Sequence, residues 1–322
     1  MAKERQGRRR FIKGAGLMAS SVFSSSFLPS AAAAQSGQTP PATGSKGAQI
    51  RSLLAKSEMI VAPIVPDIVS VRLCEMEGFQ AVQIGDSQPT TWHGYPGYGV
   101  VSYTEVLNFS VHLASNTNLP VMVGMADGGG TPLTIYRATQ ELERGGVAAV
   151  AYEDSTAETH FSRQGTLVSP ADFADRIKAA VDARRDQNLV VIARTDAVSQ
   201  GYTLEQALER GVACAEAGAD IIYFSGMRLE DHPKARDAVK KPLFHLGNAR
   251  TTPDQAKAAK VSVIAYHVDG VAHGALYEAL KELKSTGKFE QASKMLLPNG
   301  VQARLIRSDD YNALARKYHM IK

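Results

Sequence analysis

The sequence has little cysteine, a single tryptophan and no long apolar run. Its two cysteines, Cys74 and Cys214, lie in separate apolar segments and neither has metal-ligand spacing. This excludes a disulfide framework and a cysteine-zinc site, so we expect two buried free thiols. After the N-terminal region no segment approaches the ~18 consecutive apolar residues that a membrane-spanning helix needs. The mature protein is therefore predicted to have no stable place in a membrane.

Basic residues are not spread evenly along the chain. The 322 residues carry a net charge of +4, but residues 1–34 hold six Lys/Arg and one Glu. The remainder has 30 Lys/Arg and 31 Asp/Glu, a net charge of −1. Without a basic run or a patch of interleaved aromatic and basic residues, nucleic-acid binding is not expected.

The N-terminal sequence is typical of an export signal. Arg8 and Arg9 precede Phe11, a weakly apolar Ala/Ser-rich segment follows, and small residues end at Ala34. This is similar to a bacterial twin-arginine signal peptide. It predicts residues 1–34 as a signal peptide, the twin-arginine translocase as a partner, and a periplasmic or secreted location. A basic amphipathic helix or a membrane anchor is the alternative.

Residues 35–48, rich in Gly, Pro, Ser and Thr, are predicted to be a flexible linker. Eight short apolar runs then alternate with amphipathic segments such as residues 131–144, 170–185 and 204–217. Continuous apolar runs are typical of parallel strands covered on both faces. We therefore predict a (β/α)8 barrel over residues 49–285 and a helical extension over 286–322. A doubly wound open sheet is the alternative, but no Gly-rich phosphate turn follows the first run.

Active sites of such barrels lie at the carboxyl ends of the strands. The polar residues that follow the eight runs are therefore the candidates. They are Asp67, Asp86, Asp127, Glu153, Asp154, Arg194, Asp196, Ser225, Asn248, Arg250 and His267. Glu153 is a possible oxygen ligand for Mg²⁺ or a helix cap. Arg194 could clamp a carboxylate or phosphate, or pair with Asp196.

Two loops and a glycine run complete the candidates. The three glycines after Asp127 could present N–H groups to an anion, or form an ordinary loop. The polar segment 154–168 is a possible lid, and His160 is its proton carrier near neutral pH. The segment 88–99 contains His93 and Tyr95 and could cover a substrate or contact another subunit.

The stretches APIVPDIVSVRLCEMEGF, YRATQELERGGVAAVAYED, LVVIARTDA and ALERGVACAEAGADIIYFSG carry a resemblance. The chain resembles the isocitrate lyase / phosphoenolpyruvate mutase superfamily over residues 50–280. The resemblance implies a barrel of the phosphoenolpyruvate mutase type, with a helix exchanged between subunits of a homodimer or homotetramer. It also implies Mg²⁺ or Mn²⁺ chemistry on 2-oxo acids, with Glu153 at the metal, Arg194 on the substrate carboxylate and Asn248 as a polar contact.

The chain departs from this superfamily at several sites. The usual D-x-D-T-G-Y-G after the third strand is replaced by Gly124, Ala126, Asp127 and three glycines, and the K-[KR]-C-G-H loop is absent. Identity as an isocitrate or methylisocitrate lyase is therefore not expected. The stretch AVQIGDSQP resembles the metal-binding strand end of ketopantoate hydroxymethyltransferase, which implies Asp86 as a replacement ligand.

We thus expect an exported lyase that cleaves a C–C bond of a 2-oxo or 2-hydroxy carboxylic acid through a metal-stabilised enolate. The expected metal ligands are Asp86, Asp127 and Glu153. Substrate contacts are expected from Arg194, Asn248, Asp86, Ser87 and Gly128, and proton transfer from His160, His93 or Tyr95. The alternatives are a 2-oxo acid hydrolase or decarboxylase, and a non-catalytic periplasmic barrel that binds a carboxylate.

Overall fold

The structure, a computed structural model, describes residues 44–97, 99–156 and 165–322. The predicted signal peptide, most of the predicted linker and His160 lie outside these residues. The polar segment after β4 is described only at its two ends.

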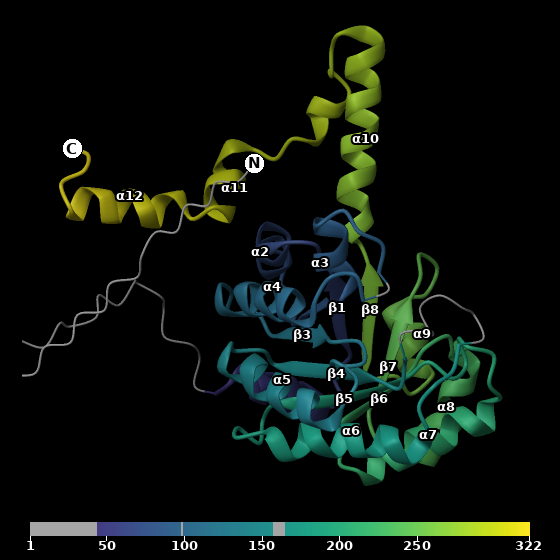
Figure 1. Cartoon of the computed structure of the whole chain (residues 1–322). Coiled ribbons are helices and arrows are strands. Elements are labelled where there is room, and N and C mark those ends of the chain that lie inside the picture. Colours follow the sequence, from purple (N-terminus) through teal and green to yellow (C-terminus); the bar gives the residue numbers. More distant parts are fainter. Residues whose placement is uncertain (1–43, 98, 157–164) are drawn as a thin grey trace, which may run out of the picture. The chain divides into compact units, whose positions relative to one another are not determined.

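Eight parallel strands close into a barrel in the order of the sequence (Figure 1). The strands are β1 (Ile60–Ile64), β2 (Val82–Ile84), β3 (Val121–Gly124), β4 (Ala149–Glu153), β5 (Val190–Thr195), β6 (Ile221–Phe224), β7 (Leu243–Gly247) and β8 (Val263–His267). Each lies within one of the eight apolar runs, and β1 pairs with both β2 and β8. The predicted (β/α)8 barrel is therefore confirmed.

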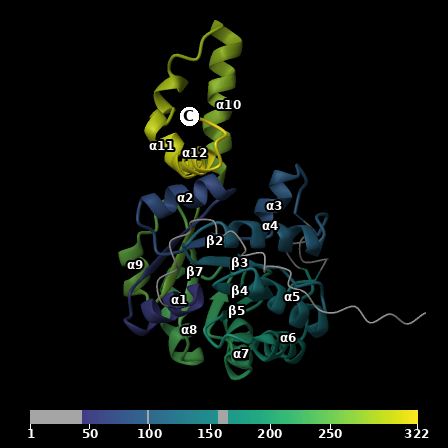
Figure 2. The same cartoon turned by 90° about the vertical axis from the view of Figure 1, so that its left-hand side faces the viewer.

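Helices connect and surround the strands (Figures 1 and 2). They are α1 (Lys46–Ala55), α2 (Ile68–Met76), α3 (Ser87–Trp92), α4 (Tyr103–Ser115), α5 (Pro132–Arg144), α6 (Pro170–Ala183), α7 (Leu204–Glu216), α8 (His232–Val239), α9 (Pro253–Ala258), α10 (Asp269–Thr286), α11 (Asn299–Leu305) and α12 (Ser308–Lys317). Short 3-10 turns precede α8 (η2, Leu229–Asp231) and α11 (η3, Ala292–Met295). In both views α5, α6 and α7 lie side by side outside β4 and β5.

Local sequence signals explain where these helices begin. Thr131 and Thr203 form capping boxes before α5 and α7, and Ser169 accepts the N–H of Asp172 before α6. Such caps satisfy N–H groups that lack a partner within the helix. Ser45 caps α1 in the same way, so a helix begins at Lys46, inside the segment predicted to be linker.

Alternate residues of each strand point into the barrel, where Ile60, Ala62, Met122, Val190 and Ile221 belong to one buried cluster. Most other strand residues pack against the helices in a second cluster, whereas outward residues of β1 and β8 belong to a third. Because side chains alternate along a strand, each inward-facing series must end at the carboxyl edge of the barrel. The last members of these series line the barrel mouth.

The C-terminal extension differs from the barrel helices. No residue of α10 is buried, whereas α11 contacts α2 and Arg72 donates to the carbonyl oxygen of Leu305. Cys74 and Cys214 are both buried free thiols, as predicted. Within the part of the chain that the structure describes, no helix has the length and hydropathy to cross a bilayer.

Candidate functional site

Three inward-facing side chains meet at the carboxyl edge of neighbouring strands. Glu153 ends β4 and is the ladder partner of Arg194 on β5, and Arg194 is the partner of Tyr223 on β6. Parallel pairing in this register places the three side chains at the same level of the barrel. The sequence predicted the first two of them at this edge.

Glu153 and Arg194 form an ion pair inside the mouth. Nη1 of Arg194 lies 2.6 Å from Oε1 of Glu153, and Nη2 and Nε of Arg194 each lie 3.0 Å from Oδ1 of Asp196. The guanidinium carbon lies 5.3 Å from the centre of the Tyr223 ring, a cation–π distance. Arg194 therefore pairs with Asp196, as one prediction had it. It also faces the cavity, where it could bind a carboxylate or phosphate, as the other prediction had it.

The Glu153 carboxyl group is almost completely buried, with 3% of its surface exposed. Burial raises its pKa to about 8; the neighbouring carboxylates of Asp196 and Asp86 add to this, whereas Arg194 and Ser155 oppose it. The Glu153 and Asp196 carboxylates hold the pKa of Arg194 well above its usual value, although burial opposes them. The site thus combines a permanent cation with a buried carboxyl group whose pKa is raised.

A buried arginine fixes the backbone around Glu153. Arg176 of α6 donates to the carbonyl oxygens of Glu153 (3.0 Å), Ser155 (3.1 Å) and Gly130 (3.1 Å). Three carbonyl groups on two loops are thereby held by one guanidinium. The end of β4 and the glycine-rich loop after β3 are therefore connected through α6.

The neighbouring carboxylate, Asp154, points away from the cavity. It is fully buried and accepts hydrogen bonds from the Thr195 hydroxyl (2.6 Å), the Asp196 N–H (2.9 Å) and Arg210 (3.2 Å). Of the two adjacent acids that end the fourth run, Glu153 faces the mouth and Asp154 supports the rim.

The mouth encloses a small cavity of about 90 Å³. It is lined by Ile64, Gln83, Gly85, Asp86, Ser87, Gln88, Gly124, Ala151, Glu153, Ile192, Arg194, Tyr223, Phe244, Leu246 and His267. Polar groups occupy the side formed by β2, β4, β5 and the end of β8, and apolar side chains from β1 and β7 close the rest. A small acid with one apolar face is the kind of ligand this lining suits.

Two predicted substrate contacts, Asp86 and Ser87, lie in this cavity. Asp86 precedes α3 and makes no side-chain cap hydrogen bond. Gln83, also in the lining, has a buried Oε1 without a hydrogen-bond partner among the described residues. An unsatisfied buried acceptor is costly, so Gln83 is a residue for which a ligand donor would be favourable.

The glycine-rich loop after β3 is a tight turn in which the N–H groups of all three glycines are used. The N–H groups of Gly128, Gly129 and Gly130 donate to Met125 O, Asp127 Oδ1 and Asp127 O respectively. All three glycines have positive φ, between 65° and 84°, a region that glycine adopts without strain. Gly128 packs against Ile135 and Tyr152 and does not line the mouth cavity.

Asp127 lies in an adjacent cavity of about 380 Å³, which Asp86 also borders. Among the described residues, no three His, Cys, Asp or Glu side chains are grouped closely enough to hold a metal ion. Asp86 and Glu153 share the mouth, but Arg194 and Ser155 engage both oxygens of Glu153. These donors do not fit the predicted three-carboxylate site for Mg²⁺.

The remaining predicted site residues lie elsewhere. His93 and Tyr95 are exposed after α3 and do not line the mouth. Asn248 Oδ1 accepts the N–H of Arg250 (2.8 Å) in the loop after β7 and does not line the mouth either. Their predicted roles remain untested, as does that of His160, which lies outside the described residues.

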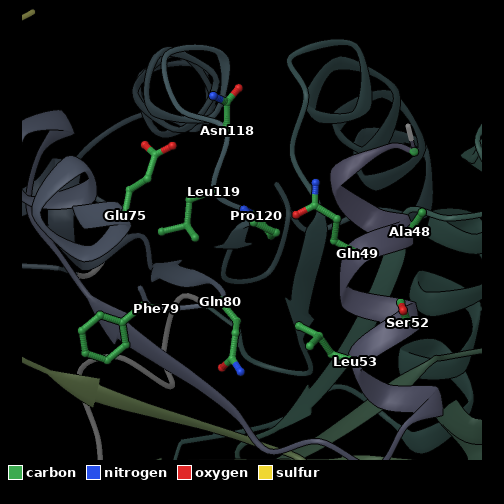
Figure 3. A pocket seen from close by; sticks show the side chains of 11 residues that line it. Ala48, Gln49, Ser52, Leu53, Glu75, Phe79, Gln80, Asn118, Leu119 and Pro120 are labelled. Atoms are coloured by element: carbon green, nitrogen blue, oxygen red, sulfur yellow. The ribbon is translucent and has the colours of Figure 1, made fainter. Parts of the chain in front are cut away.

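A second pocket, of about 500 Å³, lies at the opposite end of the barrel, where α1, α2 and the segment before β3 meet (Figure 3). Its polar groups are mainly the amides of Gln49, Gln80 and Asn118. Its one carboxylate, Glu75, accepts a hydrogen bond from Thr117 (3.0 Å). With no second ionisable group in the lining, this pocket lacks the pairing that acid–base chemistry requires.

Gln83 and Tyr223 were not among the predicted site residues, and Gln88 was predicted only as part of the segment 88–99. His267 was expected at a strand end without a chemical role. Following every second residue of each strand from the buried core to the carboxyl end would have found Gln83, Tyr223 and His267. The inward series Val263, Ala265, His267 is one example.

Comparisons with known proteins agree with the barrel fold. The family described as phosphoenolpyruvate phosphomutase matches residues 50–284. The chain belongs to this family. A 2-methylisocitrate lyase of Shewanella oneidensis is 35% identical over 207 residues, 63% of this chain and 70% of the relative. An oxaloacetate decarboxylase of Paraburkholderia xenovorans is 32% identical over 263 residues, 77% of this chain and 87% of the relative.

Among solved structures, the family member 2,3-dimethylmalate lyase superposes with a TM-score of 0.76 at 25% identity, covering 86% of this chain and 100% of that chain. The relatives are thus named as lyases and decarboxylases. Their identity to this chain neither confirms nor contradicts the prediction that it is not a methylisocitrate lyase.

Proposed function

We propose that this protein is a lyase that cleaves a C–C bond of a 2-oxo or 2-hydroxy carboxylic acid. The observation that carries the proposal is Arg194, a permanent cation inside a small cavity, paired with a carboxyl group of raised pKa. The names of the relatives support the reaction class, since they act on acids of this kind.

Arg194 would bind the substrate carboxylate. Asp196 accepts the Nε–H of Arg194, and the Glu153 and Asp196 carboxylates lie within ion-pair distance of its two Nη groups. Arg194 also lines the cavity, so its remaining N–H groups would donate to a ligand there. Two parallel donors match the two oxygens of a carboxylate. Tyr223 and Phe244, whose ring centres lie 4.7 Å apart, would exclude water from the same side.

Glu153 would hold or deliver a proton. Cleavage of a 2-hydroxy acid requires loss of the hydroxyl proton, and the electron pair of the broken C–C bond must be accommodated as an enolate that is then protonated. Burial raises the pKa of the Glu153 carboxyl group, so it takes up a proton more readily than an exposed carboxylate and is suited to that final step. Mg²⁺ or Mn²⁺ stays a prediction from the family resemblance, and no step is derived through it.

The proposal extends to location and assembly. Export by the twin-arginine route to the periplasm or outside the cell follows from residues 8–34. A homodimer or homotetramer follows from the family resemblance and from the exposed apolar side chains of α10–α12. Hydrolysis or decarboxylation of a 2-oxo acid is the alternative chemistry, and binding without turnover is the non-catalytic alternative.

The experiment is a substrate panel. The purified protein is incubated with 2-methylisocitrate, 2,3-dimethylmalate and oxaloacetate, with and without Mg²⁺, and the products are identified by mass spectrometry. Arg194→Lys should lower kcat/KM for the active substrate by roughly 30- to 150-fold, since lysine cannot replace a fork that makes charged hydrogen bonds worth about 2–3 kcal/mol. Arg250→Lys is the matched control, because Arg250 is exposed at the rim and does not line the cavity.

Three results would count against the proposal. If Arg194→Lys and Arg250→Lys lower kcat/KM equally, Arg194 does not bind the substrate carboxylate. Release of CO₂ and one shortened acid, in place of two acids, would favour the decarboxylase alternative. Thermal stabilisation by these acids without any product would favour the binding barrel.

A further inference from the structure

His267 occupies the position at which β8 enters the mouth. It is the last inward-facing residue of that strand, is the ladder partner of Ile64, and lines the same cavity as Arg194 and Glu153. Its side chain is 53% exposed and therefore lies at the open end of the cavity.

The histidine ring is held by a carboxylate. Nδ1 of His267 lies 3.1 Å from Oδ1 of Asp269, the first residue of α10. A carboxylate at Nδ1 favours the tautomer with its proton on that nitrogen and leaves Nε2 as an acceptor. No other side-chain hydrogen bond of His267 occurs among the residues the structure describes.

Asp269 is fixed in turn by Gln88, a neutral side chain of α3. Gln88 Nε2 donates to Asp269 Oδ2 (2.8 Å), and Gln88 Oε1 accepts the N–H of Gly85 (2.6 Å). Gln88 is nearly fully buried, with 2% of its surface exposed. Its two hydrogen bonds connect the start of α10 to the end of β2.

We propose that His267 is a catalytic base of this protein, and that Asp269 and Gln88 are its positioning residues. The inference rests on the proposed lyase function and deepens it by naming the group that removes the hydroxyl proton. A base held by a carboxylate that is itself held is the arrangement found where a histidine must keep one tautomer and one orientation.

The proton balance of the step is simple. The hydroxyl proton of the substrate passes to Nε2 of His267, and the C–O bond becomes a carbonyl as the adjacent C–C bond breaks. The electron pair of that bond stays on the departing carbon as the enolate of the second acid. That carbon later receives one proton, so nothing is oxidised or reduced.

The test uses the full protein and the substrate found active in the panel above. His267→Ala should lower kcat by about 10²- to 10⁴-fold, the usual contribution of a general base, with KM little changed. Added imidazole should restore part of the lost rate, because the removed side chain leaves room for it. His273→Ala, an exposed histidine on the same helix as Asp269, is the matched control and should behave as wild type.

Asp269→Asn tests the positioning role separately from folding. It should lower kcat rather than raise KM, and ¹⁵N NMR of the His267 ring should show loss of the single Nδ1–H tautomer. The Asp269→Glu variant should recover part of the rate.

The outcomes separate this inference from the proposed function. If Arg194→Lys is impaired but His267→Ala turns over at the wild-type rate, the base assignment is overturned and the lyase proposal stands. If imidazole restores nothing to an impaired and folded His267→Ala, the base assignment is also overturned. If wild-type protein turns over no acid of the panel, both proposals fail together.

Discussion

The three glycines after Asp127 show how single residues set the shape of the rim. Each has a left-handed φ and each N–H is used within the turn, so the loop is compact and does not form an anion-binding nest. Gly128 is also packed closely: a Cβ there would lie 2.5 Å from Ile135 Cγ1 and 2.8 Å from the Tyr152 ring.

Gly128→Ala should therefore lower the free energy of unfolding by about 2–4 kcal/mol, the sum of backbone strain and overpacking. Urea denaturation measures it. Gly287→Ala is the matched control, since Gly287 has a similar φ of 71° but nothing within 4 Å of the added Cβ. It should cost only about 1–2 kcal/mol from the backbone. Equal losses at both sites would contradict the packing at Gly128.

At the scale of single donors, the mouth offers little to a divalent cation. Two carboxylates line the mouth. The Asp86 side chain makes no hydrogen bond to the first turn of α3, whereas the Glu153 oxygens are engaged by Arg194 and Ser155. Isothermal titration with Mg²⁺ alone should give weak binding, because few protein oxygens are available and bound water must supply the rest.

Addition of oxalate, which brings two carboxylates of its own, should strengthen that Mg²⁺ binding. Asp127→Asn should leave it unchanged, since Asp127 lies in the neighbouring cavity. Tight binding of Mg²⁺ by the free protein, lost in Asp127→Asn, would restore the three-carboxylate site that the sequence predicted.

At the scale of elements, β7 and α8 bury two histidines against each other. His245 of β7 and His232 of α8 have ring centres 4.7 Å apart, and His232 Nδ1 lies 3.0 Å from the Arg228 carbonyl oxygen. Burial lowers the pKa of His245 to about 4, and His232 adds to the effect. The pKa of His232 is also lowered, first by burial, although Asp231 and the Arg228 backbone oppose this.

A lowered folded-state pKa means that the neutral ring is favoured in the fold. The stability from His245 is therefore fully present above its unfolded pKa of about 6.5 and is lost as the pH falls toward 4. The loss should reach at most about 3 kcal/mol, at 1.36 kcal/mol per pKa unit.

Denaturation at several pH values between 4 and 7 measures this dependence. His245→Gln should flatten it, whereas His93→Gln, which removes an exposed histidine, should not. If the free energy of unfolding of His245→Gln depends on pH as steeply as that of the wild type, other groups cause the pH dependence.

The elements themselves were largely predictable from the sequence. Parallel strands covered on both faces must be continuous apolar runs, so all eight were found, and parallel register then brought Glu153 and Arg194 together. The direction of Asp127 was not predictable, because it depends on hydrogen bonds inside a turn. The His267–Asp269–Gln88 chain was missed because Gln88 of α3 lies 181 residues before Asp269 in the sequence.

At the scale of the whole molecule, the C-terminal helices carry many exposed apolar side chains. On α10, Leu276, Leu280 and Leu283 are 57%, 54% and 45% exposed and follow helical spacing. Apolar stripes of this kind are typical of surfaces covered by another protein, which agrees with the proposed homo-oligomer.

Light scattering after size-exclusion chromatography should show a dimer or tetramer. The double variant Leu276→Lys/Leu280→Lys should dissociate it, because two charges would be buried at the interface. Leu133→Lys is the matched control, since Leu133 of α5 is 82% exposed and outside this stripe. A monomeric wild-type protein would contradict the proposal.

The three hydrogen bonds of Arg176 have a consequence for anyone who redesigns this barrel. Because one guanidinium holds the backbone beyond β3 and beyond β4, neither loop can be exchanged alone without leaving donors of Arg176 unpaired. A graft should move both loops together with α6, as a single module. Libraries that vary only one of them are expected to yield mostly misfolded or inactive clones.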